Sequence, residues 1–164
     1  MMNKRDIINY LQEKNIWYEI TEHEAVYSMS EVSNVELPYP ESDAKNLFVR
    51  DDKHNNYYLI TVKGNKKVDL KEFRHTNNTR PLSFASSEEL NEILKLKPGS
   101  VSPFGLLSDK ENKVKFYIDK AFYDNRGIIG IHPNENTATV WLKIDDLVQI
   151  IEESGHTVCK IDIE

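Results

Sequence analysis

Two segments far apart in the chain carry residues that could act on an acyl group. Lys45 lies in the alternating segment 44–51, and His132 follows Gly130 in a short apolar segment and precedes Pro133. Neither residue belongs to a nucleophile motif, since the sequence contains no G-x-S-x-G, H-E-x-x-H, Walker loop or dinucleotide fingerprint. If the two segments meet, the site would bind and polarise an acyl group without attacking it covalently.

The segment around Lys45 has the alternation of a strand. Asn46 and Phe48 share one face, whereas Lys45 and Leu47 share the other. A lysine in such a strand is commonly an edge residue whose amine reaches water. In a pocket it could instead hold a phosphate or an acyl oxygen, and it would act as a base only if burial strongly lowered its pKa.

A loop from Gly99 to Pro103 is the third candidate. Glycine allows close backbone approach, and free N–H groups in the loop, which contains Ser100, Val101 and Ser102, could stabilise an oxyanion. The alternative is an ordinary helix C-cap followed by a turn. For His132 the alternative is likewise a structural or solvated turn histidine, held extended by the proline that follows it.

The remaining reactive residue types do not indicate a metal or a thiol site. Cys159 is the single cysteine, and its alternating apolar surroundings favour core packing over nucleophilic chemistry. The five histidines have no ligand spacing and no second cysteine to assist them. We therefore expect no metal and no cofactor.

The composition is that of one soluble domain. The 164 residues are 39% hydrophobic and 29% charged, no apolar run approaches the ~20 residues of a membrane span, and no signal peptide precedes the first amphipathic segment. We expect a cytoplasmic protein.

The net charge of −6 disfavours a generic nucleic-acid binder. Segment 63–80 is nevertheless locally basic and could contact phosphates. The alternative is that this segment is a solvated helix face.

The periodicity predicts hairpins with helices between them. Expected strands and helices are helix 4–14, strand 17–21, a helix beginning at the capping box 28–31, hairpin 45–62, a basic helix 69–75, strand 82–85, a helix after the capping box 86–89, strand 114–118, hairpin 127–144, a helix capped by Asp145 or Asp146, and a closing strand 159–163. This is an α+β pattern with a largely antiparallel or mixed sheet rather than repeated βαβ units.

Taken in order, these segments resemble a known family. The motif Ala44-Lys45-Asn46-Leu47-Phe48, the 57–59 strand, Gly99-x-x-x-Pro103 and Gly130-x-His132-Pro133 are similar to the YbaK/prolyl-tRNA-synthetase-associated editing domains, in particular their free-standing ProX/PrdX-type branch. The likeness covers nearly the whole chain. It implies that residues 1–164 form a single α+β domain around a curved mixed sheet flanked by helices.

The resemblance also implies an activity and its residues. The family's activity is deacylation of mischarged tRNA in trans, here tRNA for proline carrying alanine, with prolyl-tRNA synthetase as a candidate partner. The family's lysine and its neighbour fall on Lys45 and Asn46, its loop on Gly99–Pro103 and its histidine on His132. Arg80, chosen for its basic surroundings, is our candidate for an acceptor-stem contact. No protein nucleophile is needed, since a water, or the neighbouring ribose hydroxyl, can take part.

Three alternatives remain open from the sequence. The chain could be a non-catalytic module that binds the aminoacyl end of tRNA. It could catalyse the same reaction on cysteinyl or seryl esters. It could also be a small-molecule acyl hydrolase, in which case binding would be insensitive to salt and to replacement of Arg80 or Lys67.

Overall fold

The computed structural model describes residues 2–23, 37–124 and 126–163. The helix predicted to begin at the capping box 28–31 lies outside these residues. None of the helices in the described ranges is long and apolar enough to cross a membrane.

The described strands form two sheets. A three-stranded antiparallel sheet has the order β1-β7-β6, and a five-stranded sheet has the order β4-β2-β3-β5-β8. In the second sheet β4, β2 and β3 are antiparallel, whereas β5 and β8 add in parallel. The mixed α+β architecture is therefore confirmed, as are the two hairpins. The bounds are β1 Tyr18–Glu22, β2 Ala44–Asp51, β3 Tyr57–Lys63, β4 Leu82–Phe84, β5 Val114–Asp119, β6 Ile128–Ile131, β7 Ala138–Lys143 and β8 Val158–Ile161.

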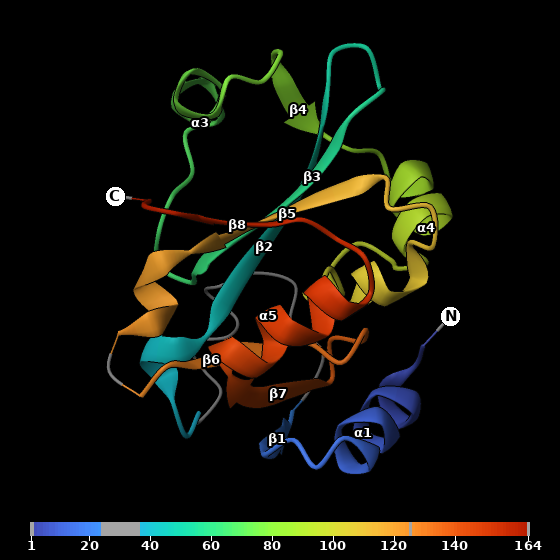
Figure 1. Ribbon diagram of the computed structural model, residues 1–164, viewed down its shortest axis with the longest axis vertical. Coiled ribbons are helices and arrows are strands. Elements are labelled where there is room, and N and C mark those ends of the chain that lie inside the picture. Colours follow the sequence, from blue (N-terminus) through green and yellow to red (C-terminus); the bar gives the residue numbers. More distant parts are fainter. Residues whose placement is uncertain (1, 24–36, 125, 164) are drawn as a thin grey trace.

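A parallel bridge between Asp43 and Gly130 links the two sheets. It attaches the start of β2 to β6, while the other end of β2 pairs with β4 through Val49–Asp51. Figure 1 shows β2 as the long strand that runs from the region of β6 and β7 toward β4. Strand β2 is therefore the element shared by both halves of the molecule.

Helices cover both sheets. They are α1 Lys4–Glu13, α3 Leu70–Asn77, α4 Ser87–Leu94 and α5 Ile144–Glu153, with short 3-10 helices η1 Pro40–Ser42, η2 Pro103–Ser108 and η3 Lys120–Tyr123. The capping box predicted at the start of α4 is present, with Ser86 and Glu89 exchanging side-chain and backbone bonds. In Figure 1, α1 and α3 lie at opposite ends of the molecule, and α5 lies between them.

The start of α5 differs from the prediction. Neither Asp145 nor Asp146 is the N-cap: Lys143 occupies that position and makes no capping bond through its side chain. Strand β7 runs directly into the helix, and the N–H of Ile144 donates to the carbonyl of Gly127. The two aspartates lie in the first turn instead, where their charges favour the positive end of the helix dipole.

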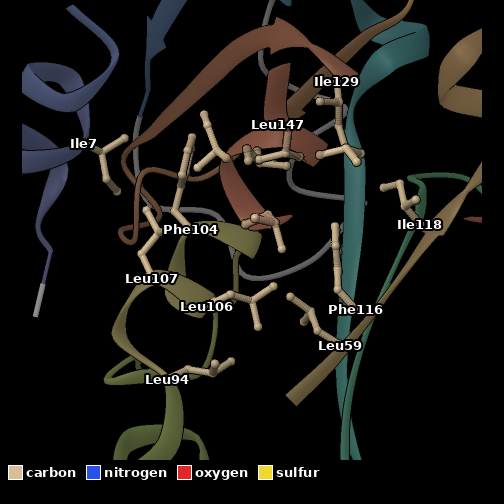
Figure 2. Packing of buried hydrophobic residues seen from close by; sticks show 14 of the residues in the cluster. Ile7, Leu59, Leu94, Phe104, Leu106, Leu107, Phe116, Ile118, Ile129 and Leu147 are labelled. Carbon is tan, nitrogen blue, oxygen red and sulfur yellow. The ribbon is translucent and has the colours of Figure 1, made fainter. Parts of the chain in front are cut away.

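Two apolar clusters pack against the opposite faces of the five-stranded sheet. The larger joins α1, α4, η2, α5 and the inner faces of both sheets, as the converging side chains of Figure 2 show. The smaller lies under α3 and includes Val49, Val62 and Phe73, and Cys159 packs against it. The packing position expected for Cys159 is thus confirmed.

Candidate functional site

The first residues of β2 divide between the two faces of the sheet. Ala44 packs against the larger core, and Phe48 is part of it. Because side chains alternate along a strand, Asp43 and Lys45 lie on the opposite face. Leu47 and Val49 continue that face into the smaller core. The lysine therefore lies where an apolar face begins, as the sequence predicted.

The bridge to β6 brings the histidine segment to the same face. Gly130 is the bridge partner of Asp43, and His132 lies two residues further on, as Lys45 does on its own strand. In β7, the face opposite the larger core carries Thr139 and Trp141. The structure thus gathers Lys45, Gly130 and His132 on one face of the joined sheets. We call this face the site face.

The amine of Lys45 is held by the turn after β3. Its Nζ donates to the carbonyl of Lys66 at 2.5 Å. Burial, and secondarily the charge of Lys67, lowers the pKa of Lys45 below its ordinary value. The ammonium is therefore fixed at a defined point and partly withdrawn from water.

A buried carboxylate supports this turn. Asp119, 1% exposed, pairs with the Nζ of Lys66 at 2.8 Å and accepts from the N–H of Lys63 at 3.3 Å. Lys66 also donates to the carbonyl of Ile163, next to the closing strand. The acceptor of the Lys45 amine is consequently anchored from two sides.

The ring of His132 has one defined orientation. Its Nδ1 lies 3.1 Å from the carbonyl of Ala138, and a carbonyl only accepts, so Nδ1 carries the proton. Burial lowers the pKa of His132, which favours the neutral ring and leaves Nε2 as an acceptor. The ring centroid of His23 lies 6.4 Å away, and His23 bonds Thr139 at 3.0 Å.

The loop from Gly99 to Pro103 is tied to the histidine segment. Ser102 is fully buried, and its Oγ donates to the carbonyl of His132 at 2.6 Å. Gly99 has a φ of +87°, which glycine adopts readily, and the N–H of Ser100 already donates to Lys97. Of the loop N–H groups proposed for an oxyanion, that of Ser100 is therefore already used within the turn.

Asn46 lies on the face opposite Lys45. Its Oδ1 accepts from the hydroxyl of Thr61, its partner on β3, at 2.6 Å. Thr61 is fully buried. The structure therefore separates the side chains of Asn46 and Lys45, and Asn46 contributes to the site by fastening β2 to β3.

Arg80 lies near the opposite end of β2 from Lys45. Its Nε and Nη2 donate to the carboxylate of Asp52 at 2.6 and 2.9 Å. Seven residues of extended chain separate Asp52 from Lys45, or roughly 20 Å along the strand. Arg80 is thus outside the reacting centre, at a distance that an RNA single strand could span.

Gly130 has a packing reason of its own. A Cβ built there would lie 2.2 Å from Cζ3 of Trp141, so the indole ring occupies the space over the glycine. The indole N–H donates to Thr21 at 3.0 Å, and Tyr39 packs 5.6 Å from the ring. Gly130 therefore shapes the site face by admitting this ring.

Two further residues near the site face, Asp43 and His23, were not predicted from the sequence. Asp43 could have been found, because the alternation that selects Lys45 also selects the residue two positions earlier. His23 could not, because only the pairing of β1 with β7 brings it to Thr139. Within the described residues no group of three His, Cys, Asp or Glu side chains could hold a metal ion.

Comparison with known proteins assigns this arrangement to a family. The model of the aminoacyl-tRNA editing domain matches residues 23–150, which include Lys45, the Gly99–Pro103 loop and His132. The chain belongs to this family. As an aminoacyl-tRNA editing domain it is an ester hydrolase of the deacylase type, as the resemblance implied.

Similar full-length proteins and structures agree with this membership. The editing domain is 37% identical over 160 residues to the prolyl-tRNA editing protein ProX of Acetoanaerobium sticklandii, covering 98% of this chain and 97% of that protein. It is 30% identical over 141 residues to prolyl-tRNA synthetase associated domain-containing protein 1 of Mus musculus, covering 84% and 83%. The fold matches a crystal structure of a candidate trans-editing enzyme for prolyl tRNA synthetase, with a TM-score of 0.69, 18% identity and coverage of 98% and 96%.

Proposed function

We propose that this editing domain acts in trans on tRNA(Pro) that carries a non-cognate amino acid, with alanyl-tRNA(Pro) as its main substrate. The observation that carries the proposal is the 37% identity, over nearly the whole chain, to a prolyl-tRNA editing protein. The reaction would take place in the cytoplasm, where charged tRNA is used. Prolyl-tRNA synthetase, which would produce the mischarged substrate, is the candidate partner.

Lys45 acts as a cationic anchor in this proposal. An ammonium group has three N–H donors, and the described residues provide one acceptor for them, the carbonyl of Lys66. The other donors can hold the terminal phosphate or the acyl carbonyl of the substrate. A fixed cation stabilises the oxygen on which negative charge develops more than it stabilises the neutral ester, and this difference accelerates the reaction.

The reaction needs no group from the protein to form a covalent bond. Water, assisted by the neighbouring ribose hydroxyl, attacks the ester carbonyl, and the negative charge moves to the carbonyl oxygen. The bond to the ribose oxygen then breaks, so that the amino acid leaves and the tRNA regains its hydroxyl. Lys45 and the N–H groups of Val101 and Ser102 would face the oxyanion, and Nε2 of His132 would orient the aminoacyl end.

Selection of alanine over proline would be steric. A hydrophobic pocket distinguishes one methylene by only about 1–3 kcal/mol, so the larger proline ring must be excluded by size. Cysteinyl and seryl esters are close to alanine in size. They are therefore the competing substrates that an assay must include.

The test is a deacylation panel with purified protein. We expect alanyl-tRNA(Pro) to lose its ester faster than seryl-, cysteinyl- and prolyl-tRNA, and Lys45→Ala to reduce kcat/KM about 100-fold or more. Lys110→Ala, which removes an exposed lysine from a turn, is the matched control. Tight binding of charged tRNA without turnover of any ester in the panel would contradict the proposal and identify a binding module instead.

A further inference from the structure

Asp43 has a position in the site that its role in the fold does not explain. It precedes Lys45 by two residues, on the face opposite Ala44, and its backbone bridges to Gly130. Two residues of extended chain span roughly 7 Å, so the backbones of Asp43 and Lys45 are separated by about the length of a small acyl group, on the same face. The bridge itself needs only the backbone of Asp43 and would tolerate other side chains.

The described residues give the Asp43 carboxylate little charge compensation. The charged group that acts on it is His23, just after β1, whereas the amine of Lys45, on its own strand, donates to Lys66, and the ring of His132 lies near that of His23. None of the ion pairs found among the described residues includes Asp43. The stretch 24–36 contains no lysine, arginine or histidine, so it cannot provide a cation either.

The ionisation of Asp43 agrees with this environment. Burial raises the pKa of its carboxyl to about 6, while the N–H of Ala44 and the nearby His23 oppose the rise. A cation that entered beside the carboxylate would favour the charged form and lower this pKa again. The site is therefore suited to receive a positive charge from outside the protein.

We propose that Asp43 binds the α-ammonium group of the aminoacyl ester, an inference that rests on the proposed function. In such a substrate the ammonium is one carbon away from the carbonyl, so Lys45 at the acyl oxygen and Asp43 at the nitrogen would hold the two ends of the same small group. A charge-assisted hydrogen bond of this kind is short and directional. It favours a free amino acid over one whose nitrogen is already acylated.

This assignment predicts a chemical preference of the enzyme. Peptidyl-tRNA carries the same ester, but its nitrogen is an uncharged amide, so Asp43 would make it a poor substrate. The editing domain would then spare growing chains while removing single amino acids. Proline also carries an ammonium nitrogen, so Asp43 would not itself exclude the cognate amino acid, and that exclusion remains steric.

The experiment compares alanyl-tRNA(Pro) with N-acetyl-alanyl-tRNA(Pro) in wild type and in Asp43→Asn. We expect wild type to prefer the free amine roughly 10- to 100-fold in kcat/KM. Asp43→Asn should lose activity on the free amine by a similar factor and should hydrolyse the two esters at nearly equal rates. Asp162→Asn, which removes an exposed carboxylate that pairs with Lys120, should keep the wild-type preference.

Several outcomes would overturn the assignment. If Asp43→Asn retained the full preference, or if wild type had none, Asp43 would not bind the ammonium. Affinity for uncharged tRNA and the circular dichroism spectrum report whether the variant is folded. Should it not fold, Asp43→Glu retains the carboxylate and must retain part of the preference. If wild type hydrolysed no aminoacyl-tRNA, this result would instead contradict the proposed function itself.

Discussion

At the scale of the residue, the site is made of side chains whose roles differ from what their types alone indicate. The bridge places Lys45 and His132 each two residues after one of its partners, but a glycine between two apolar residues could not reveal that it accommodates an indole ring. The contact between Gly130 and Trp141 depends on the pairing of β6 with β7. Register, rather than residue type, decides which side chain faces which.

Gly130→Ala tests this explanation. The added methyl group would overlap the ring of Trp141, which is fully buried and cannot move into solvent. We expect a loss of about 1–3 kcal/mol in the free energy of unfolding, measured by urea titration. Trp141→Leu in the same background should recover part of the loss, because it frees the space. Equal stability of Gly130→Ala and wild type would show that the ring does not occupy this position.

At the scale of the element, most segments could be predicted, and the pairings that join distant segments could not. Local signals sufficed for α1, the β2–β3 hairpin, the capping box of α4 and the β6–β7 hairpin, because each depends on neighbours in sequence. The parallel additions of β5 and β8 and the bridge from Asp43 to Gly130 depend on contacts across the chain. The alternation of side chains along a strand predicted that Lys45 and Asn46 lie on opposite faces. It did not predict that the strands divide into two sheets.

The length of β2 leads to a prediction about RNA binding. Because Arg80 lies at the far end of this strand, its replacement should affect the tRNA body and not the ester. We expect Arg80→Ala to weaken binding of uncharged tRNA about 3- to 10-fold and to reduce the slope of log affinity against log salt by about 1.

The control for this prediction removes the partner of Arg80 and keeps its charge. Asp52→Ala would free the guanidinium that is now bound to the carboxylate, so affinity should be unchanged or higher. Fluorescence anisotropy at several salt concentrations measures both variants. If Arg80→Ala changed kcat without changing affinity, the arginine would belong to the reacting centre.

At the scale of the whole molecule, a buried polar contact ties the segment before β5 to the segment before β8. Nε2 of His156 lies 3.0 Å from the carboxylate of Asp109, which also accepts from the N–H groups of Lys113 and Val114. The imidazole is fully buried, and its Nδ1 lies 2.8 Å from the hydroxyl of Ser154. These bonds lower the pKa of Asp109 despite the opposing effect of its burial.

This contact gives the fold an acid-sensitive point. A carboxyl whose pKa is lowered on folding stabilises the native state above the unfolded pKa of about 3.9, and this stability is lost as the pH falls through the folded value. We expect Asp109→Asn to lose about 3 kcal/mol at pH 7 and to show a flatter decline below pH 4 than wild type. Glu111→Gln, in the same turn but exposed, should behave as wild type in urea unfolding at both pH values. Parallel pH profiles for Asp109→Asn and wild type would contradict this role.

The pairing of β1 with β7 has a consequence for how the protein is made. Thr21 and Trp141, whose side chains form a hydrogen bond, are 120 residues apart in sequence. Contacts of such separation form late, because loop closure must come before any gain from pairing. During synthesis the site face cannot exist until β7 has left the ribosome, although Lys45 emerges long before. We therefore expect the unfinished chain to have no hydrolytic activity toward the aminoacyl-tRNAs that surround it while it is being translated.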